Sequence, residues 1–237
     1  MIIRRKLLAM EGIDGSGKRT QIDLLCQQLE ERRVAYARFS FPRYGAFFGR
    51  MVARFLNGEF GPLEEVDPHF SALLYAGDRY EAKTELDHGL DAGKVVVTDR
   101  YIASNLAHQG ARMPAATREA FLNWLGELEY GIYKLPAEEL VVYLRLPAAQ
   151  AQQQVEQKAA RDYTQEKKDL QEANLQHLEE AARVYDHLAN QPHWVTVECF
   201  DTARGTMRPP EEIHEELMKK IETQAAYLLR RERQRKA

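Results

Sequence analysis

A glycine-rich stretch near the N-terminus has the composition and spacing of a phosphate-binding loop. It lies between the apolar run 7–10 and an amphipathic stretch over 22–29, and it reads Glu11-Gly12-Ile13-Asp14-Gly15-Ser16-Gly17-Lys18-Arg19-Thr20. A strand, a glycine-rich turn and a helix, in that order, are the context that such a loop requires. The glycines let backbone N–H groups point inward, and the start of the helix adds partial positive charge. Lys18 is then placed to reach the β- and γ-phosphates of a bound nucleotide.

One residue departs from the phosphate-loop pattern. The position after Lys18 normally carries Ser or Thr, whose hydroxyl ligates magnesium, and here it carries Arg19. Thr20 cannot simply replace that hydroxyl, because neighbouring helix positions point about 100° apart. Two interpretations stay open: Arg19 contacts a phosphate directly, or it points to solvent and the metal is held by phosphates and water.

A second group of polar residues follows the apolar run 95–98. Asp99 and Arg100 come directly after it, at the carboxyl end of a predicted buried strand, where P-loop proteins handle phosphate and magnesium. The alternative is that Asp99 only caps the next helix. A short helical stretch after it could line the same pocket with Ser104, Asn105, His108 and Gln109. Alone, His108 would more often be a surface residue than a ligand.

Three weaker patterns allow a binding role. Arg43 follows a proline-fixed turn and could bind an anion, or it could be an ordinary exposed arginine. Tyr75 and Arg79 are four residues apart and share one helix face, where they could stack on and hydrogen-bond a nucleobase. From the residues alone, an exposed surface pair is the favoured interpretation. The basic stretch 158–168 lacks apolar periodicity, which fits a cationic flap over phosphates or a solvated charge run.

The elements that position these residues alternate along the chain. Apolar runs predict strands over 7–10, 34–41, 95–98, 140–146 and 194–200, and helical periodicity fills the gaps over 20–31, 45–56, 68–90, 114–128, 148–158, 169–189 and 210–229. This alternation predicts one α/β domain with a mostly parallel sheet covered on both faces. In the helix over 68–90 we expect Phe70, Leu73, Leu74 and Gly77 to face the core. Ligands of such sheets bind beyond the carboxyl ends of the strands.

The composition excludes several classes of protein. A chain of 237 residues with 44% hydrophobic residues suits one large domain, and a net charge of −3 gives no reason to expect nucleic acid or a membrane as partner. Cys26 and Cys199 lack C-x-x-C spacing, which argues against a disulfide scaffold or zinc site and fits a reducing compartment. The apolar runs are too short to span a bilayer, and no signal peptide is recognisable, so we expect a cytoplasmic protein. The basic tail over 229–237 reads as a solvated helix end.

Together these stretches resemble the thymidylate kinase family over roughly residues 5 to 200. The resemblance is carried by the loop Glu11 to Lys18, by Phe41-Pro42-Arg43-Tyr44-Gly45, by Tyr75-x-x-Asp78-Arg79, by Asp99-Arg100-Tyr101-x-x-Ser104-Asn105-x-x-His108-Gln109, and by Lys168-Asp169-x-x-Glu172 with Tyr185. It implies a P-loop NTPase-type parallel sheet with helices on both faces and a basic lid over 158–168. It also implies transfer of the γ-phosphoryl group of ATP to dTMP with Mg²⁺, and a homodimer.

The resemblance also implies roles for individual residues. ATP would be held by Gly12, Ile13, Asp14, Gly15, Ser16, Gly17, Lys18, Arg19 and Thr20. The dTMP site would contain Asp14, Phe41, Arg43, Tyr75, Arg79, Arg100, Asn105, His108 and Gln109. The metal would be held near Asp14, Asp99 and Glu172, and the catalytic cations would be Lys18, Arg43, Arg100 and Arg161 of the lid.

The chain departs from the family at two of these positions. Gly15 stands where some members carry a catalytic arginine, so the lid would have to supply that cation. His108 stands where the family usually has tyrosine beside the sugar, which predicts weaker discrimination of dTMP against UMP. Two other functions stay open from the sequence: a deoxynucleoside kinase, and a P-loop module that binds nucleotide without catalysis.

Overall fold

A five-stranded parallel sheet forms the centre of the computed structural model, which describes residues 5–156 and 175–230. Its order is β2-β3-β1-β4-β5, with strands at Lys6–Glu11 (β1), Tyr36–Ser40 (β2), Val95–Asp99 (β3), Leu140–Arg145 (β4) and Trp194–Glu198 (β5). The central strands are nearly continuous apolar runs and are buried on both faces, whereas the edge strand β2 is only partly buried. The predicted parallel α/β fold is confirmed.

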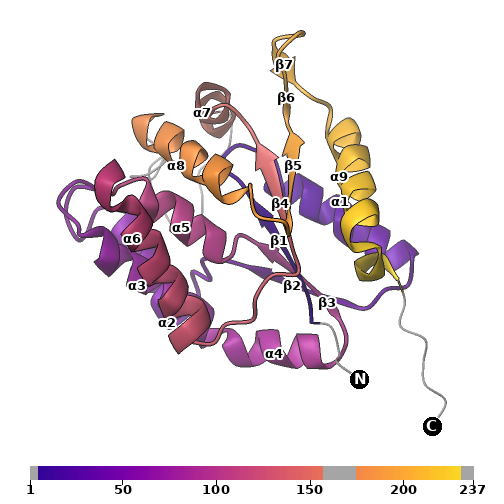
Figure 1. Cartoon of the computed structure of the whole chain (residues 1–237), viewed down its shortest axis with the longest axis horizontal. Coiled ribbons are helices and arrows are strands. Elements are labelled where there is room, and N and C mark those ends of the chain that lie inside the picture. The colour runs from indigo at the N-terminus through magenta and orange to yellow at the C-terminus, as the bar shows by residue number, and fades with distance from the viewer. Residues whose placement is uncertain (1–4, 157–174, 231–237) are drawn as a thin grey trace.

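Helices cover both faces of the sheet (Figure 1). One face carries α1 (Lys18–Glu31) and α9 (Pro210–Ala225). The other side carries α2 (Phe47–Leu56), α3 (Pro68–Glu81), α5 (Ile102–Gly110), α6 (Ala115–Gly126) and α8 (Leu175–Leu188). No helix within residues 5–156 and 175–230 is long and apolar enough to cross a membrane.

Shorter elements complete the chain. Helix α4 (Lys83–Asp91) packs near β3, and α7 (Ala148–Glu156) follows β4. A π-helical segment (Glu127–Ile132, η1) continues α6, and a 3₁₀ turn (Ala226–Leu229, η2) continues α9. The predicted strand over 194–200 ends at Glu198, and a separate antiparallel pair follows, formed by β6 (Phe200–Asp201) and β7 (Thr206–Met207).

The structure corrects the prediction for the helix over 68–90. The segment forms two helices, because α3 ends and α4 begins at Ala82. Phe70 and Leu73, which we expected in the core, are 43% and 39% exposed. Helix α3 packs between α2 and α5, and it buries Ser71, Ala72, Asp78 and Arg79 among others. The apolar stripe in the sequence therefore could not identify the buried face of α3, because that face carries mainly small and polar residues.

The strand order brings the predicted site residues to one edge of the sheet. Strand β1 lies between β3 and β4, and Met10 pairs with Asp99 while Glu11 pairs with Tyr143. The loop after β1 and the residues after β3 consequently lie side by side at the carboxyl ends of parallel strands. This is where ligands of open α/β sheets bind.

Gly49 of α2 sets how closely this helix approaches the chain at Arg43. A Cβ atom at Gly49 would overlap the backbone carbonyl group of Arg43. We predict that Gly49→Ala lowers the free energy of unfolding by about 1–3 kcal/mol, the usual cost of overpacking. Urea denaturation measures this change. Gly126→Ala is the control, because an added Cβ there has no neighbour within 4 Å, and equal losses in both variants would contradict the prediction.

Candidate active site

The loop between β1 and α1 has the backbone of an anion-binding turn. Gly12, Gly15 and Gly17 have φ angles of 140°, 86° and 88°, which favour glycine. A Cβ at Gly12 would lie 2.6 Å from the carbonyl oxygen of Leu144, and one at Gly15 would lie 2.5 Å from that of Ala151. The loop thus fits closely against the residues around β4 and α7. No side chain caps α1, whose first N–H groups are suited to an anion.

Lys18 lies at the first position of α1 and folds back over this loop. Its ammonium group donates hydrogen bonds to the carbonyl oxygens of Gly12 at 2.8 Å and Ile13 at 2.9 Å. The side chain is 7% exposed. A cation is therefore held at the centre of the loop, where phosphate oxygens are stronger acceptors than carbonyl groups.

Arg100 connects the end of β3 to the loop. Its guanidinium forms an ion pair with Asp14 at 2.8 Å, and its Nη1 donates to Gly12 O at 3.1 Å and to Ser104 Oγ at 2.9 Å. Burial lowers the pKa of Arg100, but Asp14 and other anionic groups raise it well above its ordinary value. The backbone of Arg100 has φ 64°, a strained conformation for this residue type, and such strain concentrates at functional sites.

Glu11 fixes the start of α5 from the end of β1. This carboxylate is fully buried, and it accepts hydrogen bonds from Tyr101 N at 2.7 Å and from Ser104 N at 3.3 Å. It also accepts from Ser104 Oγ at 2.6 Å and from the hydroxyl of Tyr185 at 2.9 Å. The alternative that Asp99 caps this helix is wrong, because the carboxylate of Glu11 accepts from the N–H groups of Tyr101 and Ser104 at the helix start.

Arg43 lies against the end of α3. Its backbone N–H donates to Asp78 Oδ2 at 2.8 Å, and its guanidinium pairs with Asp78 Oδ1 at 3.2 Å. Glu81 and Glu85 lie 3.7 and 3.8 Å from the same guanidinium. Burial raises the pKa of Asp78 and outweighs the opposing effect of Arg43. Arg43 is therefore held at the site by a buried carboxylate rather than exposed on a loop.

Arg79 is 2% exposed, so the interpretation as a surface pair with Tyr75 is wrong. Its Nε and Nη2 donate to Glu129 at 2.5 and 2.6 Å, and Asn105 Nδ2 donates to the same carboxylate at 2.9 Å. Burial lowers the pKa of Arg79, and the attraction and hydrogen bonds of Glu129 raise it above its ordinary value. Tyr75 is half-buried, with its ring edge-on to Phe55 at 6.4 Å.

His108 is buried in a histidine pair rather than exposed. Its Nδ1 lies 3.3 Å from Nε2 of His177 on α8, and its Nε2 lies 3.5 Å from Arg100 Nη1. Because Arg100 can only donate, His108 accepts with Nε2 and donates with Nδ1 to His177. Burial and Arg100 lower the pKa of His108 well below its ordinary value, and burial with Arg112 lowers the pKa of His177 to about 4. Both rings are neutral at neutral pH.

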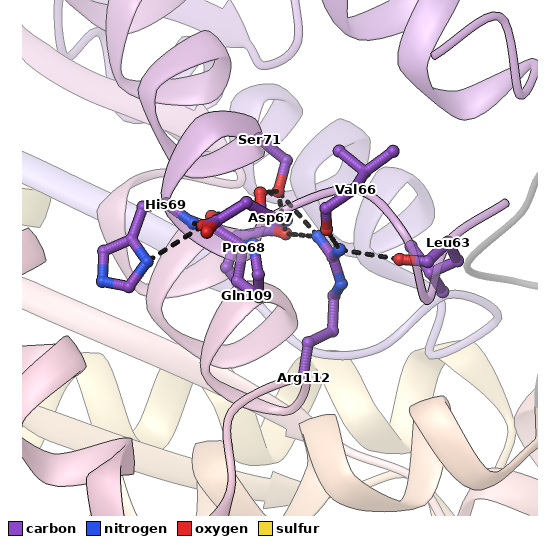
Figure 2. A network of polar contacts seen from close by, with 8 residues as sticks. All are labelled: Leu63, Val66, Asp67, Pro68, His69, Ser71, Gln109 and Arg112. Carbon is purple, nitrogen blue, oxygen red and sulfur yellow. Dashed lines mark hydrogen bonds and ion pairs between the residues drawn. The ribbon is translucent and has the colours of Figure 1, made fainter. Parts of the chain in front are cut away.

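Arg112 ties the chain before α3 to α5 (Figure 2). It donates to the carbonyl oxygens of Leu63, at 2.8 Å, and Val66, and to Ser71 Oγ at 2.7 Å. It also donates to Gln109 Oε1 at 2.9 Å, which accepts from Ser71 Oγ as well. Both donors contact Oε1, so the amide of Gln109 is oriented with Nε2 pointing away from Ser71 and Arg112. This buried nitrogen has no hydrogen-bond partner among the described residues.

The remaining residues predicted for the site either lie near the residues described above or fall outside the described ranges. Phe41 is buried beside Tyr101, with ring centroids 6.0 Å apart. Arg19 and Thr20 are exposed, and Arg19 makes no hydrogen bond or ion pair with any residue of 5–156 or 175–230. In those ranges no cluster of three or more His, Cys, Asp or Glu residues could hold a metal ion alone. Arg161, Glu172, the stretch 158–168 and residues 231–237 lie outside the described residues.

Comparison with known proteins decides the family. The family model for thymidylate kinase matches residues 10–208. The chain belongs to the thymidylate kinase family. The thymidylate kinase of Mycobacterium tuberculosis is 32% identical over 213 residues, which cover 86% of this chain and 98% of the relative. That of Plasmodium falciparum is 25% identical over 219 residues, covering 91% and 89%. Thymidylate kinases phosphorylate dTMP to dTDP with ATP, which identifies the chain as a kinase.

A solved structure shares the fold. Thymidylate kinase from Candida albicans superposes with a TM-score of 0.72 at 20% identity, and the match covers 93% of this chain and 92% of that chain. This likeness supports the P-loop arrangement of the sheet and helices.

Four residues of this thymidylate kinase site carry no sequence signal for their role. Glu11 is recognisable only as part of the loop motif, and Arg112, Glu129 and His177 belong to none of the motifs. Glu129 lies 50 residues from Arg79 and His177 lies 69 residues from His108. No local pattern joins residues so far apart, and only the order of the strands and helices places them together.

The neutral histidine pair makes the stability of this kinase depend on pH. The pKa of His177 falls from 6.5 in the unfolded chain to about 4 in the folded one. Between these values the unfolded chain binds a proton that the native state does not, so the free energy of unfolding decreases as the pH falls. We predict that His177→Gln removes up to about 3 kcal/mol of this decrease between pH 7 and pH 4. Denaturation at several pH values measures it.

His88→Gln is the control for this experiment, because His88 is exposed on α4. It should leave the pH dependence of the free energy of unfolding as in the wild type. A His177→Gln variant with the wild-type pH dependence would show that His177 is protonated as readily in the native state as in the unfolded one.

Proposed function

We propose that this chain transfers the γ-phosphoryl group of ATP to dTMP at the edge of the sheet formed by β1 and β3. The observation that carries the proposal is the ion pair of 2.8 Å between Arg100 and Asp14. It joins the phosphate-binding loop, where ATP binds in this family, to the end of β3, which is expected to bind the phosphate of the acceptor dTMP. Donor and acceptor phosphates would thus meet in one place, as in-line transfer requires.

Charge neutralisation is the main task of such a site, because both substrates are anionic. We assign it to Lys18, Arg43 and Arg100, each of which contacts a carbonyl or carboxylate oxygen of the protein. Phosphate oxygens would compete with these partners. Arg161 of the proposed lid over 158–168 would add a further cation, since Gly15 supplies none. No general base is needed, because the phosphate of dTMP is itself an oxyanion nucleophile.

Magnesium fits the carboxylates near these cations. Mg²⁺ is commonly bound through one or two carboxylates together with phosphates and water. Asp14 and Asp99, with Glu172, would offer hard oxygen ligands, and the described residues contain no larger ligand cluster. When bound, Mg²⁺ neutralises the charge that develops on the phosphates. Arg19 provides no hydroxyl ligand, and its exposure leaves it available for ATP phosphate.

The acceptor base would lie between α3 and α5. Tyr75 would stack on thymine, Arg79 and Asn105 would hydrogen-bond its edge, and Phe41, His108 and Gln109 would complete the pocket. The buried atoms Asn105 Oδ1 and Gln109 Nε2, which have no hydrogen-bond partner in the described chain, support a polar ligand there. Arg43 and Arg100 would be superfluous in a deoxynucleoside kinase, and a non-catalytic module would not require an acceptor pocket.

We also propose a single domain over 1–237, a homodimer and a cytoplasmic location. The large apolar side chains of Phe47, Phe70 and Leu73 are 58%, 43% and 39% exposed, which supports a partner surface on α2 and α3. A second copy of this chain is the partner expected from the family. Light scattering that gives the mass of one 27.3 kDa chain would contradict it.

An assay coupled to ADP release, with a panel of nucleoside monophosphates, tests the activity. We predict turnover with dTMP, and a fall of kcat/KM by about 10²–10³-fold in Lys18→Ala, the usual cost of removing one group that stabilises transition-state charge. The exposed Lys219→Ala on α9 should keep wild-type activity. Protein that binds ATP but turns over no monophosphate would refute the kinase function, and turnover of nucleosides alone would indicate a deoxynucleoside kinase.

Metal dependence tests the roles of Asp14 and Arg19. We predict that Asp14→Asn raises the magnesium concentration needed for half-maximal dTMP phosphorylation, because a neutral amide is a weaker ligand than a carboxylate. Arg19→Ser should change the KM of ATP together with the metal dependence. Magnesium titrations of the two variants and the wild type measure both effects. An unchanged titration for Asp14→Asn would place the metal elsewhere.

A further inference from the structure

Glu129 is a fully buried carboxylate on the π-helical segment Glu127–Ile132, outside the motifs on which the resemblance to the family rests. It accepts three hydrogen bonds, from Arg79 Nε at 2.5 Å, from Arg79 Nη2 at 2.6 Å and from Asn105 Nδ2 at 2.9 Å. The two residues that donate them, Arg79 and Asn105, come from α3 and α5, the helices that flank the proposed base pocket. One carboxylate thus holds both side chains that would contact the edge of the base.

Glu129 fixes which atom Asn105 presents. Asn105 Nδ2 donates to Glu129 Oε1 and to the carbonyl oxygen of Ala72 at 3.0 Å. Both partners are acceptors, so the amide nitrogen must lie on their side and Oδ1 must point the other way. Asn105 is 2% exposed, and its Oδ1 is buried with no hydrogen-bond partner among the described residues. A buried acceptor of this kind is costly unless a ligand N–H reaches it.

Glu129 also fixes the donors of Arg79. Nε and Nη2 face the carboxylate, so Nη1 is the guanidinium nitrogen without a hydrogen bond to the described residues. The positive charge of Arg79 is balanced by Glu129 in a buried pair. A neutral base beside this guanidinium therefore need not compensate its charge, and it can accept a hydrogen bond from it.

We propose that Glu129 is the positioning residue that sets the base specificity of the acceptor site, an inference that rests on the proposed function. Through Asn105 and Arg79 it presents a hydrogen-bond acceptor beside a donor. Thymine and uracil carry the complement, N3–H beside the O4 acceptor. Cytosine carries the reverse, an unprotonated N3 beside an amino group, and leaves both protein groups unpaired. Unpaired buried polar groups give strong discrimination.

The substrates dUMP and dCMP form a matched pair for the test, because both lack the 5-methyl group and they differ only at this edge. We expect the wild type to favour dUMP over dCMP by at least about 100-fold in kcat/KM. In Glu129→Gln the amide has one accepting oxygen, so it cannot accept from all three donors and Asn105 loses its fixed orientation. The dUMP-to-dCMP ratio should then fall about 10- to 100-fold, the effect of one hydrogen bond to a charged group.

Three controls separate positioning from a general loss of structure. The KM of ATP should be unchanged in Glu129→Gln. Glu127→Gln, which removes an exposed carboxylate of the same segment, should keep the wild-type ratio. A merely structural role of Glu129 would lower the turnover of dUMP and dCMP equally, and an unchanged ratio in folded Glu129→Gln overturns the inference.

A second measurement needs no variant and applies if Glu129→Gln does not fold. The wild-type enzyme is given dTMP methylated on N3, which cannot donate to Asn105 Oδ1. We expect its kcat/KM to fall at least about 100-fold below that of dTMP. Equal use of both substrates overturns the inference while the kinase function stands. Absence of turnover with every monophosphate overturns the proposed function itself, and this inference with it.

Discussion

The buried carboxylate of Glu11 is the interaction on which the arrangement of the site depends. It ends β1, binds the first N–H groups of α5 through Tyr101 and Ser104, and accepts from Tyr185 of α8. A negative charge at a helix N-terminus is favourable, and four donors compensate its burial. The phosphate loop, α5 and α8 are therefore fixed relative to one another. Arg100, which lies in the chain between β3 and α5, has its strained backbone conformation next to these fixed elements.

A second regularity is that three arginines of the site each pair with a carboxylate. Arg100 pairs with Asp14, Arg43 with Asp78 and Arg79 with Glu129. Unpaired buried charges would be strongly destabilising, so the protein satisfies them internally. The side chains of Arg100 and Arg43 are 15% and 21% exposed, so at the proposed phosphate sites an incoming anion could compete for them. The third pair is 2% and 0% exposed. In the proposed function it would contact a neutral base, so it would not need to open.

The sequence predicted the parts of the site that are local in the chain. The glycine loop, Lys18 and the Asp99-Arg100 pair follow from residue types beside apolar strands, and the alternation of elements predicted the parallel sheet. The environment of Arg79 could not be predicted, because Glu129 reaches it from a π-helical segment 50 residues away. The buried face of α3 was also missed, since it packs against other helices and carries Ser71, Asp78 and Arg79 where an apolar stripe is usual. The periodicity of apolar residues identifies buried apolar faces but does not reveal buried polar networks.

The packing of Gly15 bears on how this kinase can evolve. Some members of the family carry an arginine at this position, which supplies a cation from the loop. Here the backbone has φ 86°, and any Cβ would lie 2.5 Å from the carbonyl oxygen of Ala151 in α7. A single codon change from glycine to arginine would therefore strain the loop and push α7 away before the new side chain reached a phosphate. Exchanging the proposed lid cation for a loop cation would therefore require a rearrangement of the backbone in addition to the substitution.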